Sequence, residues 1–277
     1  MSAITVRNVW KEYGDHVVLE EINLDLASRA FIALVGPSGC GKTTFLKMLL
    51  SEETPTRGVI EVDGTPIGRE PSAERGVVFQ RYSVFPHLTV LGNVALGREL
   101  RESRFVGRLF GAKRRAAEED ARELLAAVGL AGAENKYPAQ LSGGMQQRLA
   151  LAQALIARPK VLLLDEPFGA LDPGIRAEIH LLMRKLWNDR ELTVVMVTHD
   201  LSEAFKLATR IIAFERRRNE PTDGGRYGAI LGRDIEIWPT RVAGDQQGPT
   251  ASHFGRDDPQ PHTDQRRDDS AMNGAAV

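Results

Sequence analysis

The stretch Phe31-Ile-Ala-Leu-Val35 and the following Gly36-Pro-Ser-Gly-Cys-Gly-Lys42-Thr43 decide the fold. The first five residues are continuously apolar, which is typical of a strand buried on both faces of a sheet. The residues after them match the pattern G-x-x-x-x-G-K-[ST], and the sequence KTTFLKMLL that begins at Lys42 is typical of a helix. We therefore expect a strand, a glycine-rich loop and a helix in succession, as in an α/β domain.

The glycine-rich loop has the chemistry of a polyphosphate site. Its glycines let backbone N–H groups turn toward one point, and the helix presents the positive end of its dipole there. We expect Lys42 to reach the β- and γ-phosphates and the Thr43 hydroxyl to complete the ligand shell of a Mg²⁺ ion between them. The alternative is an ordinary glycine-rich turn, which the flanking strand and helix disfavour. The predicted phosphate-binding residues are Gly36, Pro37, Ser38, Gly39, Cys40, Gly41, Lys42, Thr43 and Thr44.

Two adjacent carboxylates, Asp165 and Glu166, follow the apolar run at residues 161–164. This places them at the carboxyl end of a buried strand, where ligands bind in open α/β sheets. Asp165 is expected to hold Mg²⁺ directly or through water, and Glu166 to accept a proton from an attacking water. Taken alone, the segment fits a strand with an acidic turn equally well. Its occurrence together with the glycine-rich loop favours an active site.

The strand-like segments predict a mixed sheet. Residues 4–10 and 18–26 alternate apolar and polar side chains, which indicates half-buried antiparallel strands at the start of the chain. Residues 59–62, followed by Asp63-Gly64, indicate a strand with a tight turn, and residues 76–79 another short strand.

The middle of the chain is helical in pattern. We expect a helical subdomain at about residues 88–158, because one face of its pattern is apolar at Ala117, Ala121, Leu124, Leu125 and Val128. Strand-like and helix-like segments then alternate up to residue 214. The prediction is one nucleotide-binding domain at residues 1–239 and a disordered tail at residues 240–277, which is poor in large apolar residues.

The composition of the chain disfavours several classes of binding partner and metal site. Of the 277 residues, 36 are Lys or Arg and 37 are Asp or Glu, so no overall positive field favours nucleic acid. The single cysteine, Cys40, excludes a multi-cysteine zinc or iron–sulfur site within the chain. The longest apolar runs fall far short of the roughly 20 residues that span a bilayer. Any membrane role is therefore expected to depend on partner proteins.

The segment Leu141-Ser-Gly-Gly-Met-Gln-Gln-Arg148 resembles the signature of the ABC ATPase family, and it stands between the glycine-rich loop and Asp165-Glu166, as in that family. Ser142 is suited to cap a helix that begins with two glycines, so that a hydroxyl and free N–H groups face an anion. The resemblance implies a P-loop fold with the subdomains described above, and a dimer in which Ser142, Gly143, Gly144 and Gln147 close over ATP bound by the other subunit.

Other residues match individual positions in the sequence motifs of the same family. The resemblance assigns Tyr13 to adenine stacking, Gln80 to sensing Mg²⁺ and the attacking water, and His199 to the γ-phosphate. Asp172 matches the loop that links the two active sites, although many relatives have Ser where this chain has Gly169. The alternatives are an aromatic at a strand end, a solvated glutamine and a capping histidine. Cys40 could block ATP binding when alkylated, or could simply be a small residue that fits the loop.

The chain resembles most the nitrate/sulfonate/taurine importer group of that family. The resemblance implies an ATPase at the cytoplasmic face of the membrane, acting as a homodimer or with a paralogue, on permease subunits and a solute-binding protein. The cargo would be a small solute of that group or a urea- or guanidine-like one. Tyr82, Val84, Phe85 and Leu88 match the permease-docking groove, or pack within the helical subdomain. The alternatives for function are an exporter ATPase and a soluble ABC ATPase of DNA repair or translation.

Overall fold

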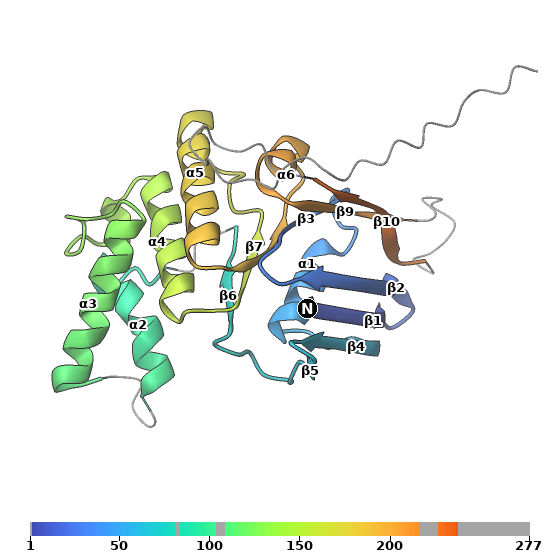
Figure 1. Cartoon of the computed structure of the whole chain (residues 1–277), viewed down its shortest axis with the longest axis horizontal. Helices are drawn as coiled ribbons and strands as arrows, with labels where there is room; N and C mark the ends of the chain where they lie inside the picture. The colour runs from blue at the N-terminus through green and yellow to red at the C-terminus, as the bar shows by residue number, and fades with distance from the viewer. Residues whose placement is uncertain (1, 81–83, 104–108, 217–226, 238–277) are drawn as a thin grey trace, which may run out of the picture. The chain divides into compact units, whose positions relative to one another are not determined.

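The computed structural model describes residues 2–80, 84–103, 109–216 and 227–237. Over these residues one sheet of ten strands has the order β5-β4-β1-β2-β10-β9-β3-β8-β7-β6 (Figure 1). Its strands are β1 (Ser2–Tyr13), β2 (His16–Ala27), β3 (Phe31–Val35), β4 (Arg57–Val62), β5 (Thr65–Pro66), β6 (Arg75–Val78), β7 (Val161–Asp165), β8 (Thr193–Val197), β9 (Arg210–Arg216) and β10 (Ala229–Glu236). The helices are α1 (Lys42–Leu50), α2 (Val90–Glu102), α3 (Gly111–Ala127), the 3-10 turn η1 (Pro138–Gln140), α4 (Gly143–Ile156), α5 (Pro173–Asp189) and α6 (Leu201–Leu207).

The sheet is mixed, as predicted. Its first part is antiparallel, with β1 paired to β2 on one side and to β4 on the other. Its second part is parallel, with β3 between β9 and β8, and β7 between β8 and β6. The carboxyl ends of β3, β6, β7 and β8 therefore lie at one edge, where the loops after them gather.

The parallel strands are covered on both faces, which explains why they read as continuous apolar runs. Ile32 and Leu34 of β3 belong to a core cluster that includes Phe45 of α1. Phe31 and Ala33, the alternate residues of the same strand, belong to a second cluster with side chains of α2 to α6. This is the doubly wound arrangement, with one buried layer on each side of the sheet.

The helices α2, α3 and α4 pack on one another within the segment predicted to be a helical subdomain (Figure 1). The five apolar positions predicted to share a face, from Ala117 to Val128, are all buried. Strand β10 pairs antiparallel with β9 and meets β2 at Ala229 and Leu19. The predicted tail at residues 240–277 lies outside the described residues.

Candidate active site

The glycine-rich loop joins β3 to α1 and has the backbone that its glycines permit. Gly39 has φ 74° and Gly41 has φ 96°, in the left-handed region that favours glycine. A side chain at Gly41 would also collide with β2, since a Cβ there would lie 2.7 Å from Leu19 Cδ2. Gly41 is the N-cap of α1, so the amides of the first turn have no acceptor within the helix. These amides and the dipole fit a polyphosphate.

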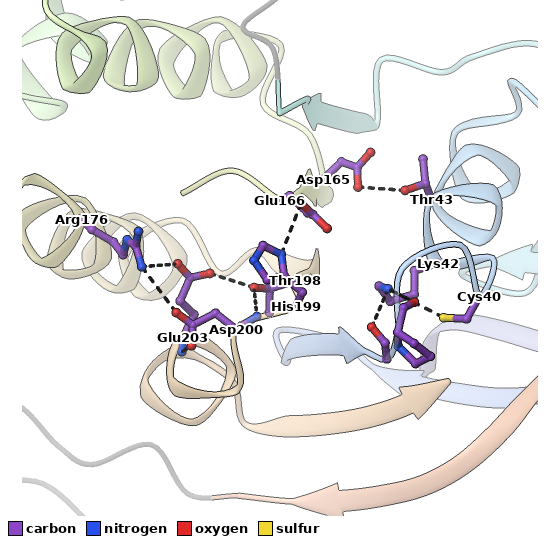
Figure 2. A network of polar contacts seen from close by, with 12 residues as sticks. Cys40, Lys42, Thr43, Asp165, Glu166, Arg176, Thr198, His199, Asp200 and Glu203 are labelled. Atoms are coloured by element: carbon purple, nitrogen blue, oxygen red, sulfur yellow. Dashed lines mark hydrogen bonds and ion pairs between the residues drawn. The ribbon is translucent and has the colours of Figure 1, made fainter. Parts of the chain in front are cut away.

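Lys42 is 5% exposed, and its ammonium turns back on its own loop. It donates to the carbonyl oxygens of Gly36 at 2.8 Å and Pro37 at 2.9 Å (Figure 2). Contact with a phosphate therefore requires Lys42 to exchange these carbonyls for phosphate oxygens. Arg216 at the end of β9 donates to the carbonyl of Gly39 at 2.8 Å, a support for the loop that the sequence did not reveal.

Cys40 lies inside the loop and is 1% exposed. Its Sγ lies 3.7 Å from Lys42 Nζ, and its side chain belongs to the core cluster beneath α1. This placement favours the interpretation of Cys40 as a small residue that fits the loop.

Thr43 and Asp165 meet across the sheet edge, as the metal prediction requires. The Thr43 hydroxyl donates to Asp165 Oδ1 at 3.2 Å (Figure 2). Burial raises the pKa of the Asp165 carboxyl, which the hydrogen bond from Thr43 partly offsets. No group of three or more His, Cys, Asp and Glu side chains suited to a metal occurs among the described residues. A hydroxyl and one carboxylate fit Mg²⁺, which commonly uses one or two carboxylates together with substrate phosphates.

Glu166 lies next to His199. The distance from His199 Nδ1 to Glu166 Oε2 is 3.4 Å (Figure 2). Glu166 has φ 45°, and its amide donates to the carbonyl of Val197 at the end of β8 at 2.9 Å. A non-glycine residue in this region is strained, and such strain is common at functional sites. Both side chains thus lie just beyond the carboxyl ends of neighbouring parallel strands.

Gln80 and Asp172 border the same edge. Val78 of β6 pairs with Leu164 of β7. Gln80 follows Val78 by two residues, and Glu166 follows Leu164 by two residues, so both come just after a pair of neighbouring strand ends. Gln80 is exposed. Asp172 is the N-cap of α5, but its side chain makes no capping hydrogen bond. Tyr13 ends β1, is 48% exposed, and has the Lys11 ammonium 4.6 Å from its ring centroid.

The signature segment forms the start of α4. Ser142 is the N-cap, and its Oγ accepts a hydrogen bond from the Met145 amide at 3.3 Å. Ser142 and Gly143 are exposed, whereas Gly144 is buried. Gln147 is fully buried, and its side-chain amide has no hydrogen-bond partner among the described residues. The prediction of Gln147 as a nucleotide contact is therefore corrected, because the helix turns this side chain into the core.

The sequence did not reveal the role of Asn93. It is buried in α2, its side chain donates to the carbonyls of Phe85, Leu88 and Thr89 at 3.0 Å each, and it accepts from the Phe85 amide at 2.7 Å.

Phe85 is 42% exposed, Val84 and Leu88 are half-buried, and Tyr82 lies outside the described residues. Phe85 lines a mainly apolar cavity of about 430 Å³ beside β6, together with Leu96 and Leu100 of α2.

The comparisons with known proteins agree with this geometry. The model of the ABC transporter family matches residues 19–169, more than half of the chain, and this stretch contains the glycine-rich loop, Ser142 and Glu166. The chain belongs to the ABC transporter family. Among solved structures, the ATP-binding cassette MJ0796 in a dimeric post-hydrolysis state bound to ADP and Pi is 30% identical, with a TM-score of 0.68. That match covers 86% of this chain and 100% of the cassette, and the P-loop cassette fold is thereby confirmed.

Longer ABC proteins are also similar. The sulfate/thiosulfate import ATP-binding protein CysA of Mycobacterium tuberculosis is 43% identical over 229 residues, which are 80% of this chain and 62% of that protein. CysA 2 of Rhizobium meliloti is 43% identical over 219 residues, 77% of this chain and 57% of the relative. The chain thus spans about three fifths of the length of these curated relatives. No helix in the described part of the chain is long and apolar enough to cross a membrane.

Proposed function

We propose that this ABC cassette binds and hydrolyses ATP. The observation that carries the proposal is that one sheet edge brings together the glycine-rich loop, the Thr43–Asp165 contact of 3.2 Å and the Glu166–His199 pair at 3.4 Å. A phosphate-binding loop, a Mg²⁺ site and a carboxylate able to accept a proton are the parts that phosphoryl transfer to water requires.

Each side chain has a distinct role in this proposal. Lys42 and the amides at the start of α1 bind the β- and γ-phosphates, and Tyr13 stacks on the adenine. Thr43 and Asp165 hold Mg²⁺, with Gln80 nearby, and the ion supplies charge neutralisation at the phosphates. Glu166 accepts the proton of the attacking water as the oxygen–phosphorus bond forms, and ADP leaves with the displaced oxygen. His199 orients the γ-phosphate from its place beside Glu166.

The complete site is proposed to form between two cassettes. Ser142 and Gly143 are exposed at the start of α4, with a hydroxyl and helix-start amides available to an anion. A second copy or a paralogue would bring Ser142 and Gly143 to the nucleotide, with Asp172 near the junction. The dimeric state named for the 30% identical cassette structure supports this arrangement.

The substitution Glu166→Gln tests hydrolysis and dimerisation together. It keeps the size of the side chain but removes the base, so we expect turnover to fall about 100-fold or more while ATP still binds. An ATP-dependent dimer should then accumulate in size-exclusion chromatography. The exposed Glu215→Gln is the control that should retain turnover and show no trapped dimer. A Glu166→Gln monomer that hydrolyses ATP at the wild-type rate would contradict both parts.

The energy of hydrolysis is proposed to drive an importer at the cytoplasmic face of the membrane. The relatives named as sulfate/thiosulfate import proteins support an import role. The cavity lined by Phe85, Leu96 and Leu100 is suited to an apolar segment of a permease. Co-purification with a multi-spanning membrane protein tests this. A stable complex with ribosomes or DNA would instead support a soluble ABC ATPase.

The proposed cargo is a small nitrogen- or sulfur-containing solute, delivered to the permease by a solute-binding protein. Sulfate and thiosulfate follow from the names of the relatives, while nitrate, sulfonates, taurine, urea and guanidine follow from the sequence resemblance. The intact complex with its permease and binding protein should show stimulated ATP hydrolysis with one of these solutes. Stimulation only by a solute of another class, such as a peptide or a sugar, would contradict the proposed cargo.

A further inference from the structure

Arg176 connects the two loops that border the Glu166–His199 pair. It lies in the first turns of α5, four residues after Asp172, and its Nη2 donates to the carbonyl of Leu171 at 3.1 Å. Its Nη1 lies 3.4 Å from Asp200 Oδ2 and 3.6 Å from Glu203 Oε1 (Figure 2). One guanidinium therefore holds the segment before α5 and both carboxylates at the start of α6.

Glu203, which Arg176 contacts, also binds Thr198, the residue before His199. It is 4% exposed, and its Oε2 accepts a hydrogen bond from the Thr198 hydroxyl at 2.8 Å. Thr198 Oγ1 in turn accepts from the Asp200 amide at 3.0 Å. The buried carboxylate of Glu203 thus holds Thr198, and Thr198 in turn holds the backbone of Asp200, whereas the His199 side chain between them is 61% exposed.

Electrostatics explain why the guanidinium is needed there. Burial raises the pKa of the Glu203 carboxyl, and the neighbouring Asp200 raises it further, whereas Thr198 and Arg176 favour the ionised form. Without Arg176, the Asp200 and Glu203 carboxylates would lose the guanidinium that contacts both of them in a partly buried place. The loop at residues 198–200 would then have to rearrange, or Glu203 would have to take up a proton.

Arg176 and Glu203 also line a cavity that reaches Glu166 and His199. This cavity of about 50 Å³ lies among Arg176, Thr198, Asp200 and Glu203 on one side and Glu166, Gly169 and His199 on the other. It has polar walls and room for about one water molecule. Any shift of Arg176 or Glu203 therefore changes the space beside the two side chains to which we assign hydrolysis.

We propose that Arg176 and Glu203 are positioning residues for hydrolysis, which fix His199 beside Glu166 and couple the segment 169–172 to the His199 loop. This inference rests on the proposed ATPase function. Neither residue touches the nucleotide in this proposal. Their loss should lower the rate of the chemical step and leave nucleotide affinity nearly unchanged.

The test compares Arg176→Gln, Arg176→Lys, Glu203→Gln and the double variant Arg176→Gln/Glu203→Gln with the wild-type chain. We expect kcat to fall about 10- to 100-fold in Arg176→Gln with KM for ATP within about twofold, and Arg176→Lys to recover part of the loss. The double variant should be more active than Arg176→Gln, because the second substitution removes the unpaired buried carboxylate.

Arg98→Gln is the matched control, since Arg98 also pairs with two carboxylates, Glu102 and Asp120, and has a similar exposed fraction of 23% against 28% for Arg176. A hydrogen-exchange readout stands apart from turnover: the Asp200 amide should exchange at least about tenfold faster in Arg176→Gln and unchanged in Arg98→Gln. An inactive wild-type chain would count against the ATPase function alone. Unchanged exchange at Asp200, or equal loss of kcat in Arg98→Gln, would overturn the positioning role.

Discussion

Gly144 of α4 lies directly against Ile175 of α5. A Cβ added at Gly144 would lie 2.5 Å from Ile175 Cγ2, closer than such atoms approach in proteins. At Gly143, the preceding residue, an added Cβ would meet nothing within 4 Å. The two glycines of the signature segment therefore have different tasks: Gly143 stays at the surface, and Gly144 lets the start of α4 pack on the helix that follows Asp172.

Gly144→Ala should destabilise the fold, and Gly143→Ala should not. The collision with Ile175 forces a shift of α4 against α5, which we expect to cost about 1 to 3 kcal/mol in the free energy of unfolding. Gly143→Ala should stay within about 0.5 kcal/mol of the wild type. Chemical unfolding measures both, and Ile175→Ala added to Gly144→Ala should recover part of the loss, because alanine lacks the Cγ2 atom that the new Cβ would meet. Equal stability of the two alanine variants would show that the contact is not tight.

Local patterns were enough to predict the proposed chemistry of the sheet edge. The glycine-rich loop and the Asp165-Glu166 pair each follow an apolar strand, and parallel strands bring their carboxyl ends together without further information. The period of a helix could also have corrected Gln147, because Gly144, Gln147 and Leu151 lie at helical spacing on one buried face of α4. The resemblance to the family signature and the helical period therefore disagree at Gln147, and the buried position agrees with the period.

Long-range pairs could not be predicted in the same way. Arg176 and Glu203 lie on different helices with β8 between them in the sequence, and Arg184 and Lys185 of α5 offered a carboxylate equally suitable partners. Their contact depends on how α5 and α6 pack on the sheet, which no local pattern specifies. The same holds for Arg216 and the carbonyl of Gly39, which lie far apart in the sequence.

Thr43→Val should weaken Mg²⁺ binding without a large loss of fold stability. The substitution keeps the shape of the side chain but removes the hydroxyl that lies 3.2 Å from Asp165 Oδ1. We expect the Mg²⁺ concentration for half-maximal ATP hydrolysis to rise about tenfold or more. Thr43→Ser retains the hydroxyl and is the control that should stay within about threefold of the wild type. An unchanged Mg²⁺ requirement in Thr43→Val would remove Thr43 from the proposed metal site.

Leu100→Glu should weaken assembly with a permease. Leu100 is 59% exposed and lines the apolar cavity beside Phe85, so a carboxylate there would have to be desolvated when an apolar segment binds. We expect affinity for the permease to fall about tenfold or more, measured by co-purification from membranes. Leu181→Glu is the matched control, because Leu181 is 57% exposed on α5 and lies outside this cavity. Equal recovery of permease with both variants would place the interface elsewhere.

His180 should make the fold less stable as the solution becomes acidic. Its side chain is buried against Phe168, with ring centroids 4.7 Å apart, and Nε2 has no hydrogen-bond partner among the described residues. Burial, with the nearby charges of Lys206 and Arg176, lowers its pKa from 6.5 to about 4. The unfolded chain therefore takes up a proton near pH 6.5, whereas the folded chain does so only near pH 4, and acid favours unfolding between these values.

The expected size of this effect is about 2 kcal/mol, after allowance for partial hydration of the imidazole in the folded state. His180→Leu removes the titrating group and keeps an apolar side chain in the core, so its free energy of unfolding should decline less between pH 7 and pH 5 than that of the wild type. His16→Leu, at an exposed position, should follow the wild-type curve. Urea unfolding at several pH values measures the difference. Parallel curves for the wild type and His180→Leu would mean that His180 in the folded protein keeps the ordinary imidazole pKa of 6.5. Its ring would then be more hydrated than its burial indicates.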